Sequence, residues 1–438
     1  MHRKLLLALF AGLLSAIPAL AQGLEKSKDW PQWRGPARDG ICTETNLLSA
    51  WSKEGPPLLW NSKVVNGGKN IGFGYSSLAI VGGKVFTMGG HGGKDDMECF
   101  AYCLDEKTGK QLWETAIGPD KAGGYPGPRC VPTVDGNRVY VLSRLGVLMC
   151  LDTEKGHVIW KKDYPKDFNG KMMSGWGFSE SPLIDGDKLV CTPGGNDAAL
   201  VALNKMTGDV IWKCAIDKVG GAAYSSIVVA EVGGIRQYIT LMHPSKGLVG
   251  VDASNGKFLW NYKKAANGTA NIPTAVVKGD LVFTSTGYGA GAAVLQLVPE
   301  GSGITANEVW FQTGKTLQNH HGGVVLIGDY IFGGHGHNQG WPFCVEMKTG
   351  KFAWEPVRGA GDGSACVLYA DGHLYFRYQN NVMALVEATP EAYKLKSQFK
   401  LPTTSGALGI GWTHPVIHNG KLFIRCDDQL LCYEISKK

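Results

Sequence analysis

Charge is scarce in this sequence. Asp, Glu, Lys and Arg make up 19% of its 438 residues, and the formal net charge is +6. These charges are spread along the chain, so the weak basic balance gives no reason to expect nucleic acid as a partner. A low charge content fits stacked sheets that are covered on both faces, and the 61 Gly fit many tight turns.

Several functional motifs are missing. The sequence contains no Cys-x-x-Cys pair with zinc-ligand spacing and no serine-nucleophile motif. The Gly-rich stretch at residues 287–291 is not followed by a helical pattern, which argues against a phosphate-binding loop. Zinc-finger, serine-hydrolase and phosphate-loop chemistry are therefore not supported.

Long apolar runs are also rare, and the clearest one lies at residues 5–17. It follows the basic pair Arg3-Lys4 and precedes Ala-Leu-Ala at 19–21, which is the pattern of a signal peptide with its cleavage site. The run is short for a membrane span. We therefore expect a signal peptide at 1–21, no membrane span, and a periplasmic or secreted protein. Because the first cysteine is Cys42, no lipoprotein anchor is expected at the cut.

The cysteines are odd in number. With eleven, at least one thiol must be unpaired. Four of them (Cys103, Cys150, Cys344 and Cys432) occupy the same position of a repeat, where other copies have Ala or Gly. This pattern predicts small, buried, free thiols, although an exported protein could form disulfides.

That repeat reads as strand, tight turn and strand. Its clearest copy, residues 150–160, has an apolar start, Asp, a polar turn with Gly, and an alternating run that ends in Trp. Other copies end at Trp113, Trp212, Trp260 and Trp354, and degenerate copies end at Trp310 and Phe399. Repeats of about 40 to 50 residues with this content predict a propeller, in which each Trp packs between adjacent blades.

A second hairpin turn precedes each copy. These turns lie at Gly82, Gly136, Gly186, Gly233, Gly279, Gly328, Gly372 and Gly420. Two hairpins per repeat give four strands per blade, so we predict an all-β, eight-bladed β-propeller of four-stranded antiparallel blades.

The ring is expected to close through its two chain ends. The stretch ending at Trp60 has no beginning, and the last copy, residues 416–435, has no Trp strand. We predict that the N-terminal strand completes the last blade and hides two sheet edges. This divides the mature chain into an aromatic, Pro-rich lead-in at 22–57, packed on the ring, and one propeller at 58–438, expected to be a monomer.

The repeat carries a family resemblance. The pattern apolar-Asp-x-x-x-Gly-x-apolar-apolar-Trp resembles the PQQ-like repeat of the WD40/YVTN-like superfamily over residues 58–435. Relatives of this kind include quinoprotein alcohol dehydrogenases and the assembly lipoprotein BamB. The lead-in motif DWPQWRGP at 29–36, with GYSS at 74–77, NIPT at 271–274 and QNHHGG at 318–323, is similar to exported single-propeller proteins of planctomycete-like bacteria. The resemblance implies a fold and carries no assigned activity.

A ligand site is expected at one mouth of the channel. The residues before each innermost strand differ between blades, whereas the turn and Trp positions do not. The candidates are Tyr75, Arg129, Glu180, Tyr224, Asn271, His320, His321, Trp412 and His414, with Trp176 from a possible lid at 172–178. Their polar and aromatic character suits a small polar ligand such as a sugar or a carboxylate. The alternatives are a solvated rim that binds nothing and a simple pairing of Arg129 with Glu180.

The resemblance also raises PQQ with calcium as a cofactor. In the quinoprotein dehydrogenases PQQ stacks between a Trp and a disulfide of adjacent cysteines, and Glu, Asn and Asp bind the calcium. Here Glu180 and Asn271 could offer oxygen ligands. The sequence has no adjacent cysteines, no CxxCH haem motif and no Asp between Asp280 and Asp329. We therefore expect no cofactor, with PQQ and calcium as the alternative.

The histidines give little support for a metal site. His320 and His321 are adjacent, so on a strand they would point to opposite faces. His335 and His337 lie in a Gly-rich stretch with no carboxylate nearby and are expected to be solvated loop residues.

We predict an exported binding or scaffold module. Its ligand would be a small polar molecule at the rim, with carbohydrate as one possibility, or a protein segment at a blade edge. The alternatives are a PQQ-dependent dehydrogenase and a carbohydrate-active lyase or hydrolase. In the last case Tyr224, His320 or His414 would act as acid or base, and Arg129 would neutralise a carboxylate. No catalytic residue is assigned.

Overall fold

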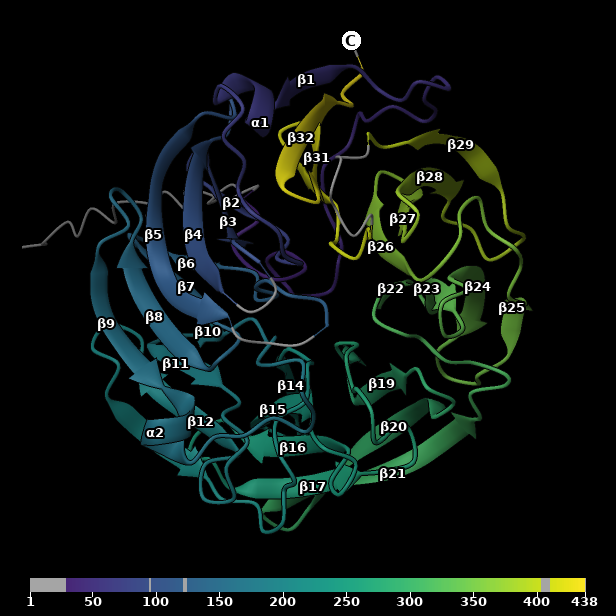
Figure 1. Ribbon diagram of the computed structural model, residues 1–438. Coiled ribbons are helices and arrows are strands. Elements are labelled where there is room, and N and C mark those ends of the chain that lie inside the picture. The colour runs from purple at the N-terminus through teal and green to yellow at the C-terminus, as the bar shows by residue number, and fades with distance from the viewer. Residues whose placement is uncertain (1–28, 94–95, 121–123, 403–409, 438) are drawn as a thin grey trace, which may run out of the picture.

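The strands form a closed ring. The computed structural model describes residues 29–93, 96–120, 124–402 and 410–437, and the expected signal peptide at 1–21 lies outside these ranges. Within them the strands form eight four-stranded antiparallel sheets, and the chain passes once around the ring from purple to yellow (Figure 1). The predicted eight-bladed β-propeller is therefore confirmed.

In seven of the eight blades the strands run in chain order from the channel outward (Figure 1). The first four blades are β2 (Ala79–Val81), β3 (Lys84–His91), β4 (Met97–Asp105) and β5 (Gln111–Asp120); β6 (Thr133–Asp135), β7 (Arg138–Leu142), β8 (Val147–Asp152) and β9 (Val158–Asp163); β10 (Leu183–Asp185), β11 (Lys188–Cys191), β12 (Leu200–Asn204) and β13 (Val210–Cys214); and β14 (Val228–Val232), β15 (Ile235–Leu241), β16 (Leu248–Asp252) and β17 (Phe258–Tyr262).

Three further blades follow the same order. They are β18 (Val276–Lys278), β19 (Leu281–Thr286), β20 (Gly291–Glu300) and β21 (Gly303–Gln312); β22 (Val324–Ile327), β23 (Tyr330–His335), β24 (Trp341–Glu346) and β25 (Phe352–Trp354); and β26 (Ala365–Ala370), β27 (His373–Tyr378), β28 (Val382–Glu387) and β29 (Leu395–Lys400). Two short helices, α1 (Ser62–Val65) and α2 (Tyr164–Phe168), lie between strands.

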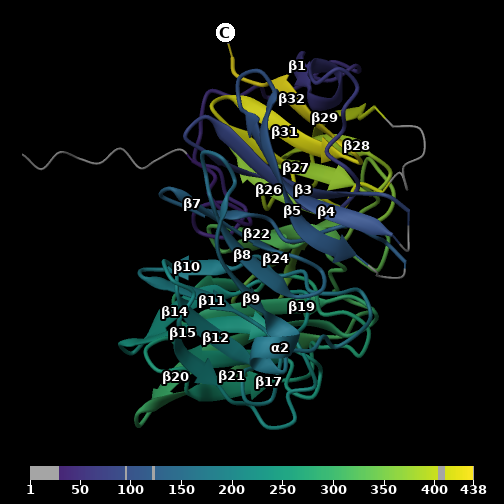
Figure 2. The same cartoon turned by 60° about the vertical axis from the view of Figure 1, so that its left-hand side comes forward.

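The eighth blade joins the two ends of the chain, as predicted. It contains β30 (Val416–His418), β31 (Lys421–Cys426), β32 (Gln429–Glu434) and β1 (Leu58–Asn61), in the order β1-β32-β31-β30. Trp60 pairs with Cys432 and Leu58 with Tyr433. In both ribbon views the purple β1 lies beside the yellow β32 (Figures 1 and 2). Closure thus depends on backbone hydrogen bonds between residues nearly the whole chain apart.

The repeated Trp and Gly lock neighbouring blades together. Trp113 of blade one donates from Nε1 to the Thr153 carbonyl of blade two at 3.0 Å. Its ring lies against Gly156 of the same turn, where an added Cβ would meet the indole at 2.6 Å. Gly156 also has a φ of +72°, so both the turn and the indole require glycine. The same contact joins Gly109 to Trp60, Gly208 to Trp160, Gly256 to Trp212, and Gly350 to Trp310.

The junction at Trp260 departs from this pattern. Trp260 of blade four faces the degenerate fifth repeat, and its Nε1 donates to Gln237 Oε1 of its own blade at 2.7 Å. A Cβ on Gly250 would lie 2.2 Å from that nitrogen. The indole therefore lies over its own sheet, which explains why Gly250 stands where four other copies have cysteine.

Part of the lead-in lies across the inner strands. Trp30 exchanges backbone hydrogen bonds with Ile80 of β2, and Cys42 N donates to the Tyr369 carbonyl of β26 at 2.8 Å. Arg34 donates to the Val324 carbonyl of β22, and Arg38 donates to the Ser181 carbonyl before β10 at 2.7 Å. Because these partners belong to four different blades, the segment spans the central channel.

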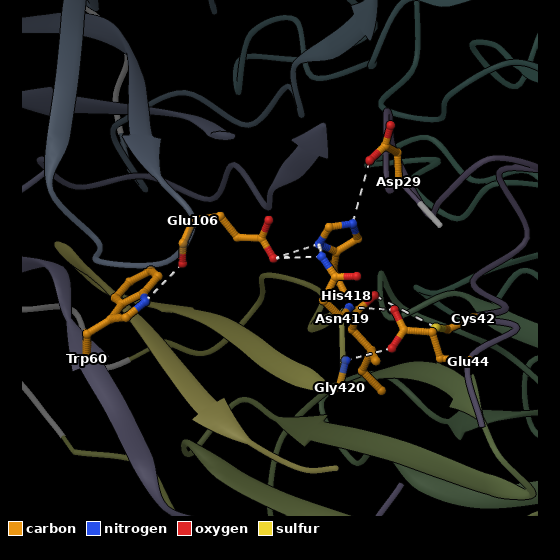
Figure 3. A network of polar contacts seen from close by, with 9 residues as sticks. Asp29, Cys42, Glu44, Trp60, Glu106, His418, Asn419 and Gly420 are labelled. Carbon is orange, nitrogen blue, oxygen red and sulfur yellow. Dashed lines mark hydrogen bonds and ion pairs between the residues drawn. The ribbon is translucent and has the colours of Figure 1, made fainter. Parts of the chain in front are cut away.

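A polar network holds the lead-in at the far end of β30 (Figure 3). The Glu44 carboxylate accepts hydrogen bonds from the backbone N–H groups of Asn419 at 2.6 Å and Gly420 at 2.7 Å. His418 Nδ1 lies 2.8 Å from Glu106 Oε1 of blade one, and its Nε2 lies 3.6 Å from Asp29. These contacts tie the lead-in, blade one and blade eight together where the ring closes.

All eleven cysteines are free and buried, as expected for the four that share a repeat position. In the part of the chain that the structure describes, no helix is long and apolar enough to cross a membrane.

Candidate functional site

A cavity of about 360 Å³ opens at one mouth of the channel. Its walls come largely from the segments just before the innermost strands. Eight of the ten candidate residues line it, namely Tyr75, Arg129, Trp176, Tyr224, His320, His321, Trp412 and His414. Ring closure brings these residues together, although they come from six different blades or the loops between them.

Arg129 provides the cationic side of the cavity. Its guanidinium lies 5.4 Å from the centre of the Tyr75 ring and donates to the backbone carbonyls of Trp176 at 2.6 Å and Tyr125 at 2.7 Å. Burial and the neighbouring Arg144 lower the pKa of Arg129 to about 10, so the group stays charged at neutral pH. Among the described residues Arg129 forms no ion pair, and the proposed pairing with Glu180 is not observed.

The expected lid segment packs against Tyr224. Ser174 hydrogen-bonds the Tyr224 hydroxyl and the Thr269 carbonyl, the latter at 2.9 Å. The Trp176 ring lies 6.1 Å from the Tyr224 ring. Burial raises the pKa of Tyr224, so its hydroxyl keeps its proton at neutral pH.

A histidine cluster forms the opposite side. His320 lies 4.3 Å from His321 and 4.1 Å from His337 between ring centroids. His320 Nδ1 is 2.8 Å from Ser364 Oγ, and its Nε2 is 3.2 Å from the Tyr288 hydroxyl. Burial and the nearby His337 lower the pKa of His320 to about 3, and burial with neighbouring His320 holds the pKa of His321 well below its ordinary value. The imidazoles are therefore neutral and can both donate and accept hydrogen bonds.

Aromatic rings complete the walls. Trp412 lies 5.2 Å from Tyr75, 5.0 Å from Tyr125 and 4.7 Å from His321 between ring centroids. Trp33 of the lead-in lies 4.7 Å from His414 and donates from Nε1 to Thr274 at 2.9 Å. The lead-in therefore contributes one wall of the cavity.

Glu180 and Asn271 do not line the cavity. Glu180 is 1% exposed and accepts hydrogen bonds from Thr192 N at 2.6 Å and the Tyr164 hydroxyl at 3.1 Å. Asn271 is fully buried, accepts from Asn267 N and donates to the Met242 carbonyl. Their neighbours Ser179 and Ile272 line the cavity instead, because successive residues of an extended segment point to opposite sides.

Other lining residues were not foreseen from the sequence. Tyr288, His337 and Gln379 come from the loops that join the second and third strands of their blades, and Trp33 comes from the lead-in. In an antiparallel blade that loop lies at the same end as the start of the first strand, so strand order alone could have identified it. The expectation that His335 is solvated was wrong, whereas His337 is partly exposed. His335 is 8% exposed, and His337 packs in the cavity 4.3 Å from Tyr288.

The lining does not fit calcium-bound PQQ. Calcium takes about six to eight oxygen ligands, usually with several carboxylates, and the described lining residues include no Asp or Glu. The carboxylate of Glu180 is occupied by Thr192 and Tyr164. In the described ranges no three His, Cys, Asp or Glu side chains are placed to hold a metal ion.

Proteins with similar sequences and structures are consistent with the propeller fold. A tetrathionate hydrolase of Acidithiobacillus ferrooxidans is 24% identical over 427 residues, which cover 85% of this chain and 77% of that protein. The outer membrane protein assembly factor BamB of Burkholderia pseudomallei is 24% identical over 364 residues, or 72% of this chain and 86% of that one. The crystal structure of quinohemoprotein alcohol dehydrogenase from Comamonas testosteroni matches with a TM-score of 0.61 at 12% identity, over 93% of this chain and 80% of that one. At such low identity the structural match shows a shared fold only.

The family assignment depends on a longer match. Residues 100–356 match the model of the PQQ_2 family, described as outer membrane protein assembly factor BamB. The match spans more than half of the chain and includes all or part of six successive blades. The protein therefore belongs to this BamB-type family of PQQ-like propellers.

Proposed function

We propose that this protein is an exported binding module that holds a small polar ligand in the cavity at the mouth of the ring. The observation that carries the proposal is a set of buried polar atoms on residues that line a cavity with aromatic walls. The Tyr75 hydroxyl, both ring nitrogens of His321 and Nε2 of His414 have no hydrogen-bond partner among the described residues. Leaving such a group unsatisfied costs about 1 to 3 kcal/mol, and a ligand that completes these hydrogen bonds would recover that free energy.

The size and walls of the cavity suit a sugar-sized molecule. Small-molecule sites usually enclose about 300 to 1,000 Å³, and this cavity is at the lower end of that range at about 360 Å³. Trp33, Trp176 and Trp412 offer flat apolar faces, against which the C–H face of a sugar ring can pack.

The three tryptophans also provide the assay. A panel of neutral and acidic mono- and oligosaccharides is titrated into the mature protein, followed by intrinsic tryptophan fluorescence and calorimetry. We expect saturable binding that is lost in His321→Ala and Trp412→Ala and kept in the control Trp113→Phe, which changes an indole on an outer strand. Failure of the whole panel to bind wild-type protein would contradict the proposal. Export is checked separately, since N-terminal sequencing of the mature protein should begin at Gln22.

A protein segment added to an outer strand is the second kind of ligand we propose. Leu112 of β5, Val158 of β9 and Ile211 of β13 are 50%, 48% and 43% exposed on outermost strands. Such edges can pair with an extended peptide, and the family is described as an assembly factor. Partners should co-purify from the cell envelope with the wild type and not with Val158→Lys. Equal recovery with both proteins would contradict this binding mode.

A carbohydrate-active enzyme remains the alternative, because Tyr224, His320 and His414 face the same cavity as Arg129. Neutral imidazoles and a protonated tyrosine could exchange protons with a bound sugar. The same panel, incubated with the protein and analysed by mass spectrometry, distinguishes the two functions. New products that disappear in Tyr224→Phe would favour the enzyme, whereas binding with no product would favour the module.

A further inference from the structure

We propose that the cavity selects a sugar acid: a ring with several hydroxyl groups and one carboxylate, such as a hexuronic acid residue, with the carboxylate at Arg129 and hydroxyls at His321 and Tyr288. This inference rests on the proposed binding function and names the class of ligand for the same cavity.

The charge of the lining supports an anionic ligand. Arg129 is the one side chain with a permanent charge among the described residues that line the cavity, and no carboxylate is among them. A cationic ligand would meet this charge without a counter-charge. Aromatic walls alone would suit a cationic ligand. The positive charge of Arg129 therefore favours an anionic ligand over a cationic one.

Arg129 also has donors to spare. A guanidinium carries five N–H donors, and the observed bonds to Trp176 and Tyr125 use two of them. These two bonds and the Tyr75 ring hold the group in place on the wall. A guanidinium fixed in this way binds a carboxylate with charge-assisted hydrogen bonds.

A second guanidinium, that of Arg144, lies near Arg129. Arg144 is 2% exposed and pairs with Asp120 at 2.9 Å. The Nη2 atom of Arg144 has no hydrogen-bond partner among the described residues. A second buried guanidinium therefore lies close to Arg129, and its positive charge makes this side of the cavity more favourable for a ligand that carries a negative charge.

The opposite side is suited to hydroxyl groups. It combines the unpartnered nitrogens of His321 with Nδ1 of His337 and the hydroxyl of Tyr288. Neutral imidazoles can both accept from and donate to a sugar hydroxyl. These residues come from blades five and six, whereas Arg129 precedes blade two. Blades two and six lie across the ring from each other, so the carboxylate and the hydroxyls of one sugar can be held at opposite ends.

The experiment compares matched ligands on wild-type protein by calorimetry. The probes are D-galacturonate, its uncharged methyl ester and D-galactose, with 4-hydroxybenzoate as a ring that carries a carboxylate but is not a sugar. We expect galacturonate to bind about 10- to 100-fold more tightly than the ester or galactose. Arg129→Gln should remove this difference, Arg129→Lys should restore part of it, and the exposed control Arg236→Gln should leave it unchanged.

The outcomes distinguish the inference that the ligand is a sugar acid from the proposed binding function on which it rests. Equal affinity for galacturonate and its ester would overturn the carboxylate inference, and any saturable binding would still support the binding module. Tight binding of 4-hydroxybenzoate without galacturonate would overturn the assignment to sugars. Failure of these probes and of the whole sugar panel would overturn the proposed function itself. Because the ester comparison uses only wild-type protein, a folding defect in the Arg129 variants cannot obscure it.

Discussion

The outer edge of the ring and its mouth are built from the same repeat but use it in opposite ways. At the outer edge Trp packs on Gly of the next blade at five junctions, Trp113 on Gly156 among them. At the mouth, equivalent positions hold Tyr75, Arg129, His321 and Trp412, whose side chains differ from blade to blade. Positions that every blade needs for packing stay alike, whereas positions that meet in a single cavity differ and complement one another.

Removing one indole at the outer edge and one at the mouth should have the largest and most different effects, the first on stability and the second on ligand binding. Trp113→Ala removes a ring that is 8% exposed between two blades, and we expect unfolding free energy to fall by about 3 to 5 kcal/mol. Trp412→Ala enlarges a cavity that is already open, and should change stability by about 1 kcal/mol or less while abolishing ligand binding. Urea unfolding and calorimetry measure the two effects. A large stability loss in Trp412→Ala would break the distinction.

Glycines of one blade can sharpen the same comparison. Gly156→Ala and Gly136→Ala both place a Cβ at positive φ, +72° and +56°, which costs about 1 to 2 kcal/mol. The added Cβ meets Thr115 Oγ1 at 2.5 Å and the Trp113 indole at 2.6 Å in the first case, and nothing within 4 Å in the second. We therefore expect Gly156→Ala to be the more destabilising by about 1 to 2 kcal/mol. Equal midpoints in urea would mean that the contacts of Gly156 with Thr115 and Trp113 add nothing beyond turn geometry.

Acid should weaken the closure of the ring. Burial alone would raise the pKa of Glu106, but His418, Asn419 and Lys421 together outweigh it and hold the pKa below its ordinary value of 4.5. A lowered pKa stabilises the fold above pH 4.5, and that stabilisation disappears as the pH falls through the lower folded-state value. At neutral pH we expect Glu106→Gln to lose about 1 kcal/mol, and the gap to wild type should close in acid.

The matched control for Glu106→Gln is a glutamate in an exposed ion pair. Glu154 is 73% exposed and pairs with Lys84, so Glu154→Gln should change stability by about 0.5 kcal/mol or less at any pH. A gap between wild type and Glu106→Gln that persists unchanged in acid would contradict the assigned role of Glu106.

The smallest expected effect is that of pH on ligand binding at the mouth of the ring. Because the pKa of His320 is lowered to about 3 and that of Arg129 is about 10, neither group changes charge between about pH 5 and about pH 8. Binding of the strongest ligand in the panel should therefore vary less than about two-fold over this range. A steep change centred near neutral pH would show that a cavity histidine titrates in the normal range.

Much of the cavity could be predicted from the sequence. The wrong and missing assignments of lining residues have a simple cause. Counting repeats located the segments that precede the innermost strands, and this was enough to name eight residues that line the cavity. Glu180 and Asn271 fail because the alignment of divergent segments is uncertain by one residue, and one residue reverses the direction of a side chain. Trp33 and His337 were missed because neither belongs to the repeat position that was compared.

The sequence by itself determined the ring. Strand periodicity, glycine turns and recurring Trp are local signals, and each blade repeats them, so their sum specifies eight sheets and the closing strand at Trp60. Only the tertiary structure decided what lies inside the ring. Arg34 and Arg38 cross the channel, Trp33 forms one wall, and Glu180 turns away from the cavity. These three features depend on packing between segments far apart in the chain, which no local pattern encodes.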